Sequence, residues 1–196
     1  MTNLQTFRPT SALVMAGVVF ALDALFVIQF VFFGDGSWVT QTALVITTAS
    51  FAWLLFVRPK VLIYDEGITI VNPFITATIG WAEVDSIETK FAFTVESGRA
   101  KVVAWAAPAP GRFHGRSVHA SELKGIDYDK DFGIRPGDSP RSASGTAAHL
   151  ARTRLANFRK SKQATSAKRS GVLNYVGVAL AALSVASIAF VLLVRV

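Results

Sequence analysis

Three apolar stretches divide the polar parts of the chain. Residues 11–33 contain one charged residue, Asp23, and residues 38–57 and 172–194 contain none. Roughly 20 helical residues cross a hydrocarbon core of about 30 Å, so each stretch is long enough to span a bilayer. Core helices of a soluble protein explain the pattern less well, because uncharged runs of this length rarely occur three times in a short chain. The pattern predicts three transmembrane helices.

The first two stretches are separated by residues 34–37, Gly-Asp-Gly-Ser, which favour a turn. The first stretch is longer than the apolar region of a signal peptide, and it ends in Phe and Val rather than in a small-residue cleavage site. We therefore expect a hairpin of two spans that stays in the mature protein.

The basic residues that flank the spans predict their orientation. Arg8 precedes the first span, Arg58 and Lys60 follow the second, and the hairpin turn has no basic residue. A larger basic cluster precedes the third span and outweighs Arg195 beyond it. Lys and Arg are enriched on the cytoplasmic side of membranes. The sequence thus predicts an inner (cytoplasmic) cell-membrane protein with residues 1–10 and the middle segment cytoplasmic, and with the hairpin turn and C-terminus external.

The middle segment begins with short alternating stretches. Their β-branched residues and period of two predict strands at residues 61–64, 68–72, 75–79, 86–95 and 100–106. Asp65, Glu66 and Gly67 form the first turn, in which we expect glycine to supply a positive φ. Pro73 ends the second strand because it cannot donate to a ladder. Residues 58–124 are therefore expected to form an antiparallel meander, closed into a barrel or strongly bent.

The sequence VLIYDEGITIVNPFITATIGWAEVDSIE, followed by ESGRAKVVAWA and preceded by Phe7-Arg8-Pro9, resembles the actinobacterial PH-like domains typified by low-molecular-weight protein antigen 6. The resemblance covers roughly residues 7–107. It implies a PH-superfamily fold, a bent antiparallel barrel closed at one end by a helix, and it implies no established activity. The residues that carry it are Glu66, Gly67, Asn72, Pro73, Trp81, Glu83, Val84 and Trp105.

These signature residues have mainly structural interpretations. Trp81 and Trp105 are expected to fill the barrel, and Glu83 is expected to accept hydrogen bonds at a turn. PH domains that bind phosphoinositides use a basic loop between their first two strands. The matching turn here, residues 65–67, is acidic and would repel phosphate, so phosphoinositide recognition in that mode is not expected.

The composition supports a membrane protein and shows where its charge lies. Hydrophobic residues make up 52% of the chain and charged residues 17%, with a mean hydropathy of +0.43; charged residues are about a quarter of a soluble domain. The net charge of +7 is local, because residues 141–170 contain eight basic residues and no acidic residue. We interpret residues 125–171 as a linker followed by this basic arm.

The basic arm contains a predicted amphipathic helix over residues 146–160. Its apolar face is formed by Ala147, Leu150, Ala151, Leu155 and Phe158. One interpretation is a helix on the anionic inner leaflet; a solvated positive-inside flank explains the charge equally well. A nucleic-acid-binding arm is a weaker option, and no nucleic acid is expected as a partner. The first interpretation assigns lipid contact to Arg152, Arg154, Arg159, Lys160, Lys162, Lys168 and Arg169.

Nothing in the sequence indicates catalysis. His114, His119 and His149 accompany no recognisable set of metal ligands, and the chain has no cysteine. No nucleophile motif and no glycine-rich phosphate loop is present. We therefore expect no enzyme activity, no metal or cofactor, and no small-molecule substrate.

Asp23 is the polar residue that most needs an explanation, because a charge midway along a span costs at least about 2.5 kcal/mol. Gln41 and Asn174 are polar residues of the other spans that could pair with it. An interhelical hydrogen bond is the simpler interpretation, and proton or ion handling is the alternative. Hydroxyl groups offer further candidate partners at Thr47, Thr48, Ser50, Ser184 and Ser187.

Small residues in the third span allow close helix packing. Gly177 and Ala181 form one such pair and Ala182 and Ala186 another. Either pair could meet the hairpin of the same chain or a second copy.

Together these patterns predict an α+β membrane protein that has no catalytic function. Its cytoplasmic PH-like domain is expected to mediate protein interaction or complex assembly, because confinement to a membrane raises the effective concentration of weak partners. The expected partners are the anionic inner leaflet and a membrane protein complex or a second copy. The alternative is a small transport or channel component in which Asp23 lines a path through an oligomer.

Overall fold

The computed structural model describes residues 2–34, 37–110, 136–161 and 167–194. The chain divides into two compact units. One unit comprises Met1–Pro9 and Pro59–Val172 and holds the strands together with one helix. The other comprises Thr10–Arg58 and Leu173–Val196 and holds three apolar helices.

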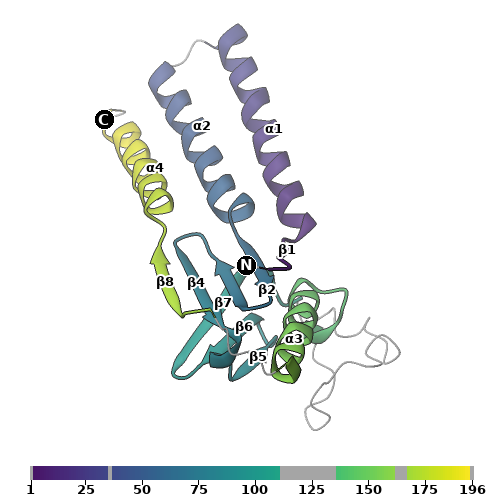
Figure 1. Cartoon of the computed structure of the whole chain (residues 1–196). Coiled ribbons are helices and arrows are strands. Elements are labelled where there is room, and N and C mark those ends of the chain that lie inside the picture. The colour runs from purple at the N-terminus through teal and green to yellow at the C-terminus, as the bar shows by residue number, and fades with distance from the viewer. Residues whose placement is uncertain (1, 35–36, 111–135, 162–166, 195–196) are drawn as a thin grey trace. The chain divides into compact units, whose positions relative to one another are not determined.

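The helical unit contains α1 (Thr10–Phe33), α2 (Trp38–Ala52) and α4 (Tyr175–Val194) (Figure 1). The α2 helix continues into a π-helical turn, Trp53–Val57. Each of the three is long and apolar enough to cross a bilayer. This agrees with the spans expected from the sequence.

The apolar side chains of these helices are largely uncovered. In α1 only Ala16 and Phe30 are buried, whereas Phe32 and Phe33 are 72% and 78% exposed. A helix that is apolar around its whole circumference needs an apolar environment. The exposed apolar surface of these helices is compatible with a lipid environment.

Within the helical unit, α2 contacts both α1 and α4. On α4, Gly177 and Ser184 are buried, whereas Ala182 and Ala186 are exposed. Small residues let two helix backbones approach closely. Of the two small-residue pairs, α4 therefore packs through the one that contains Gly177.

The strands form two sheets. In the first, the order is β1 (Gln5–Phe7), β2 (Lys60–Tyr64), β3 (Gly67–Val71), β4 (Ile75–Gly80) and β8 (Ser170–Leu173). In the second, the order is β5 (Ser86–Glu88), β6 (Ala92–Ser97) and β7 (Ala100–Pro108). Neighbours from β1 to β4, and from β5 to β7, pair antiparallel.

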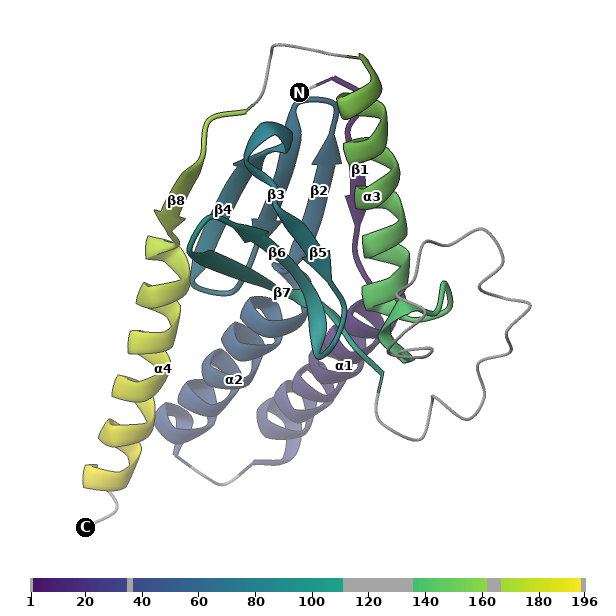
Figure 2. The ribbon, with the colours of Figure 1, turned by 90° about the horizontal axis from the view of Figure 1, so that it is seen from below.

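The two sheets pack against each other and against α3 (Ala143–Ser161) (Figure 2). Their shared core contains Ile63, Ile70, Trp81 and Phe93, all with at most 1% of their surface exposed. The α3 helix extends the predicted segment by a few residues at its start. It supplies Ala147, Ala148, Ala151 and Leu155 to the core, with Leu150 and Phe158 packed beside them.

This packing changes the interpretation of the basic arm. The apolar face of α3 is covered by the two sheets and is not available to lie on lipid. Residues 136–161 are therefore part of the compact strand unit, whereas the sequence suggested a linker and a separate arm.

Several strand expectations are corrected. The described strands form two separate sheets, whereas the sequence predicted one barrel or one strongly bent sheet. Residues 86–95 hold two strands, because Thr89–Phe91 interrupts them. Neither β1 nor β8 was expected, since three or four residues beside an apolar span give too short a pattern to recognise.

Two signature residues behave differently from expectation. Trp105 is 55% exposed and does not fill the core, whereas Trp81 is 1% exposed as expected. Gly67 is not among the glycines with positive φ; of the described glycines only Gly98 is. Gly67 is needed for space, because a Cβ there would lie 2.5 Å from the carbonyl oxygen of Ile79.

Candidate functional site

A groove in the strand unit lies between β5 and α3 and is lined by both charged and apolar side chains. Its volume is about 600 Å³. Both walls belong to the same compact unit. The groove is lined by Asp85, Ser86, Ile87, Arg152, Leu155, Ala156, Arg159 and Lys160.

Arg152 is fixed at the wall of the groove. Its Nη2 donates to the carbonyl oxygen of Ile87 at 2.9 Å, and its Nη1 lies 3.4 Å from Asp138 Oδ1. Asp138 is itself held by Thr89, whose hydroxyl donates to the same oxygen at 2.6 Å. Because β5 is the outer strand of its sheet, Arg152 also covers a backbone acceptor that another strand could otherwise use.

The rest of the groove carries unequal charge. Arg159 Nη2 donates to the carbonyl oxygen of Val84 at 3.4 Å, and Arg159 and Lys160 are both exposed. Asp85 is the groove's single carboxylate, and it accepts a hydrogen bond from the backbone N–H of Gly98. Among the lining side chains three are cationic and one is anionic. Because Arg152 is already paired with Asp138, the exposed positive charge comes from Arg159 and Lys160, beside the apolar side chain of Leu155.

The remaining basic residues assigned to lipid contact are dispersed. Arg154 Nη1 lies 2.6 Å from Asp65 Oδ1, so this cation fastens α3 to the β2–β3 turn. Arg169 Nη1 donates to the carbonyl oxygen of Ser97 at 3.4 Å. Lys168 is exposed, and Lys162 lies outside the described residues. The sequence could not separate these groups, because they share a single run of positive charge.

Asp23, on the apolar helix α1, has a partner on α2. Its Oδ1 accepts a hydrogen bond of 2.7 Å from the hydroxyl of Thr48, one of the hydroxyls considered from the sequence. Among the described residues, none donates to Asp23 Oδ2, and the same holds for Gln41 Oε1. The contact thus links the middles of two adjacent apolar helices.

Asn174 has a different place from the one expected. It immediately precedes α4, and its carbonyl oxygen accepts a hydrogen bond from Val178 N–H at 3.0 Å. Asn is a favoured residue at this capping position. It therefore lies just before the third apolar helix, whereas the sequence placed it within the third span as a candidate partner of Asp23.

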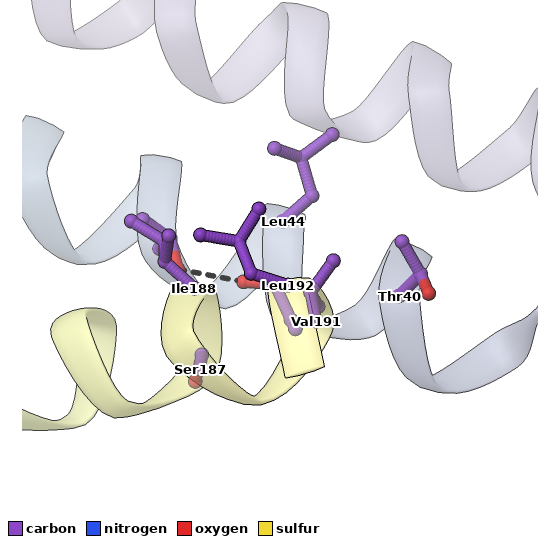
Figure 3. A pocket seen from close by; sticks show the side chains of 8 residues that line it. Thr40, Leu44, Ser187, Ile188, Val191 and Leu192 are labelled. Atoms are coloured by element: carbon purple, nitrogen blue, oxygen red, sulfur yellow. Dashed lines mark hydrogen bonds between the residues drawn. The ribbon is translucent and has the colours of Figure 1, made fainter. Parts of the chain in front are cut away.

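An apolar pocket of about 300 Å³ lies between α2 and α4 (Figure 3). Thr40, Leu44, Ser187 and Leu192 are among its lining residues. The hydroxyl of Thr47, also in the lining, donates to the carbonyl oxygen of Ala43 in its own helix at 2.7 Å. Most of the lining side chains are apolar, so this pocket suits an acyl chain or a helix side chain better than a polar ligand.

Two of the signature residues, Trp81 and Asn72, connect different strands through side-chain hydrogen bonds. Trp81 Nε1 donates to the carbonyl oxygen of Tyr64 at 2.8 Å. Asn72 joins the two sheets, because its Nδ2 donates to the carbonyl oxygen of Val103 and its Oδ1 accepts from the N–H of Trp105. Pro73 is buried beside it, and Glu83 is exposed in a 3₁₀ turn.

The described residues contain no group of three side chains that could hold a metal ion. His149 is exposed on α3, and His114 and His119 lie outside the described part of the chain. No protein-family model, curated protein or solved structure matches this chain.

Proposed function

We propose that this chain is an integral membrane protein without catalytic activity, whose strand unit binds an acidic segment of a protein partner. The strand unit would face the cytoplasm as a PH-like domain, and the partner would occupy the groove between β5 and α3. The observation that carries the proposal is the excess of exposed cations in that groove: Arg159 and Lys160 against Asp85.

Membrane anchoring is supported by the three apolar helices and by their uncovered surfaces. Two spans separate Pro9 from Pro59, so an anchored chain would return to the side from which it started. Basic residues at both of these ends favour the cytoplasmic side. An anchored domain would meet membrane-bound partners at a raised effective concentration.

The PH-like assignment is supported by the order of the elements. Two small sheets pack face to face, and α3 follows the last strand of the second sheet and packs on their shared core. The signature residues Trp81 and Asn72 occupy joints of this arrangement. A scaffold of this kind can host a binding groove without contributing chemistry of its own.

The groove favours an acidic protein segment for two reasons. Arg159 and Lys160 are exposed cations that can pair with carboxylates, whereas Arg152, held by Ile87 and Asp138, shapes the wall beside them. Leu155 and Ile87 add apolar contact area, which an extended segment with alternating acidic and apolar residues would cover. Complementary charge also speeds association and orients the partner.

The test is peptide binding to the full chain in nanodiscs of neutral phosphatidylcholine. The probe is a fluorescent peptide with alternating Glu and Leu, and its matched control carries Gln in place of Glu. The variant Arg159→Gln/Lys160→Gln should bind the acidic peptide about tenfold more weakly, a loss of about 1.4 kcal/mol. The variant Arg99→Gln/Lys168→Gln removes the same charge at exposed positions outside the groove and should leave binding unchanged.

Equal loss in both variants would mean that net charge, and not the groove, attracts the peptide. Absence of binding to the unaltered chain would reject an acidic segment as the ligand. If anionic vesicles displaced the peptide through the same residues, the groove would be a lipid site instead. Partners recovered by mild-detergent purification should be lost selectively from the groove variant.

A further inference from the structure

Four large apolar side chains are exposed at one place on the strand unit. Phe74 and Ile75, in and after the β3–β4 turn, are 41% and 52% exposed. Val103 and Trp105, on β7, are 51% and 55% exposed. These four side chains are named the turn patch below.

Asn72 brings the two halves of the turn patch together. Its side-chain amide bonds the carbonyl oxygen of Val103 at 2.7 Å and the N–H of Trp105 at 2.9 Å. Its own backbone N–H donates to the carbonyl oxygen of Ile75 at 2.9 Å, which closes the turn that carries Phe74. The patch is therefore a built feature of the fold, held by three hydrogen bonds from one residue.

The strand register places this turn at a particular end of the first sheet. Phe7 pairs with Val61, Lys60 with Val71, and Val71 with Thr76. This row of pairs lies at one end of the sheet. At that end β1 finishes and continues into Arg8 and Pro9, and β2 begins just after Pro59. The turn between β3 and β4 lies at that same end, where the chain leaves twice toward apolar helices.

Covalent geometry limits how far this end can stand from a membrane. Three residue steps separate Phe7 from the first residue of α1 at Thr10, and three separate Val57 from Lys60. An extended chain covers at most about 11 Å in three steps. The polar layer on each side of a bilayer is about 5–8 Å thick. In a chain anchored by these helices, two such short tethers would limit this end of the sheet to within about 11 Å of the helix ends.

We propose that the turn patch inserts into the headgroup layer of the bilayer in which the chain is anchored. Aromatic rings such as those of Trp105 and Phe74 are suited to the membrane–water interface. Arg8 and Lys60, at the same end of the sheet, complement anionic headgroups. The exposed apolar area is thus covered by lipid, which explains why Trp105 is outside the protein core. This inference rests on the proposed membrane anchoring and is independent of the groove.

The test uses the absence of cysteine from the chain, so that each introduced cysteine is the single labelling site. Phe74→Cys and Val103→Cys are each labelled with an environment-sensitive fluorophore in the full chain. The chain is reconstituted in vesicles of phosphatidylcholine and phosphatidylglycerol. Quenching is then measured with a nitroxide lipid and with aqueous iodide.

Two further positions serve as controls. Leu4→Cys labels another exposed apolar residue, which lies beside the far end of β1, about 10 Å from Phe7 at the usual rise per residue. Leu22→Cys labels the exposed surface of α1 and reports anchoring itself. Circular dichroism checks that each labelled variant retains its fold.

The expected result is several-fold stronger nitroxide quenching at positions 74 and 103 than at position 4, with the reverse order for iodide. If the label at position 22 is quenched by lipid but those at 74 and 103 are quenched only by iodide, the turn patch faces water and the inference is wrong. If both quenchers fail at 74 and 103, protein covers the patch, which also overturns it. If position 22 escapes lipid quenching, the anchoring fails instead.

Discussion

The hydroxyl of Thr48 donates a 2.7 Å hydrogen bond to Asp23 Oδ1, between the middles of α2 and α1. The same hydroxyl oxygen lies 3.0 Å from the carbonyl oxygen of Leu44. A single hydroxyl proton cannot serve both acceptors fully. Substitutions of Asp23 and Thr48 can therefore test whether this hydrogen bond only stabilises the helix pair or whether Asp23 handles protons or ions.

We predict that Asp23 and Thr48 are coupled by about 0.6 kcal/mol, with an upper bound of about 1.7, as for other hydrogen bonds between membrane helices. A double-mutant cycle of Asp23→Leu and Thr48→Val, read from unfolding in mixed micelles, measures this coupling, because each change removes one partner of the hydrogen bond. Thr47→Val is the matched control, because that hydroxyl bonds to Ala43 in its own helix. Ion flux through proteoliposomes that Asp23→Asn abolishes would instead support the transport alternative.

A second prediction compares two tryptophans. Trp81→Phe should lower the free energy of unfolding by roughly 2–4 kcal/mol, because it leaves a cavity and an unsatisfied carbonyl at Tyr64. Trp105→Phe should cost less than about 0.5 kcal/mol, since that ring is 55% exposed. Thermal and chemical unfolding of the full chain in detergent measure both. Equal losses would show that the ring of Trp105 also supports the core.

Gly67 is the subject of a third prediction. Gly67→Ala would place a Cβ 2.5 Å from the carbonyl oxygen of Ile79, and should destabilise the strand unit by about 1–3 kcal/mol. Gly171→Ala meets nothing within 4 Å and should be neutral within about 0.5 kcal/mol. The melting temperatures of the two variants in the same detergent provide the comparison. A neutral Gly67→Ala would contradict the close approach of β3 and β4 at this pair.

A fourth prediction concerns pH. Hydrogen bonds, first from Lys101 and then from Ser86, hold the pKa of Glu96 below its ordinary value of 4.5. A carboxyl whose pKa is lower in the folded state contributes stability above its unfolded pKa, and that contribution is lost as the pH falls through the folded value. The contribution of Glu96 should therefore be complete near neutral pH, begin to decline near pH 4.5 and be lost as the pH falls further, through the lowered pKa of the folded state.

The same pair behaves oppositely at alkaline pH. Hydrogen bonding to Glu96 raises the pKa of Lys101 above its ordinary value of 10.5, so the contribution of Lys101 is present below that pH and is lost above it. Melting temperatures of Glu96→Gln and of the unaltered chain should converge in acid and differ near neutrality. The difference should be small, because the pair is exposed to solvent. A constant difference across the acid range would contradict this assignment.

The three apolar helices and the position of α3 could be predicted from sequence. A bilayer requires about 20 consecutive apolar residues whatever the fold, and the 3.6-residue period of Ala147, Ala151 and Leu155 does not depend on what covers them. The period alone could not say whether lipid or protein covers that face. Only packing against the two sheets assigns it to the protein core.

The groove could not be predicted from sequence, because its walls are far apart in the chain. Asp85 and Ile87 on β5 meet Arg152 and Arg159 on α3 only after both sheets have formed. In the sequence these arginines belong to one basic run. In the structure the role of each arginine follows from its partner: Arg152 bonds Ile87 and Asp138, and Arg159 bonds the carbonyl oxygen of Val84.

By itself, the sequence determined which segments are apolar enough for lipid, which residues alternate as strands and where positive charge accumulates, since these are local properties of composition and period. Tertiary structure alone decided that β1 joins the sheet across the hairpin, that Trp105 lies outside while Trp81 lies inside, and that α3 turns its apolar face inward. The physical reason is that burial is a relation between distant segments. Ala104 and Ala106 take the inner face of β7 because Trp81 and Phe93 already fill the core, and the only face left for the ring of Trp105 is the outer one.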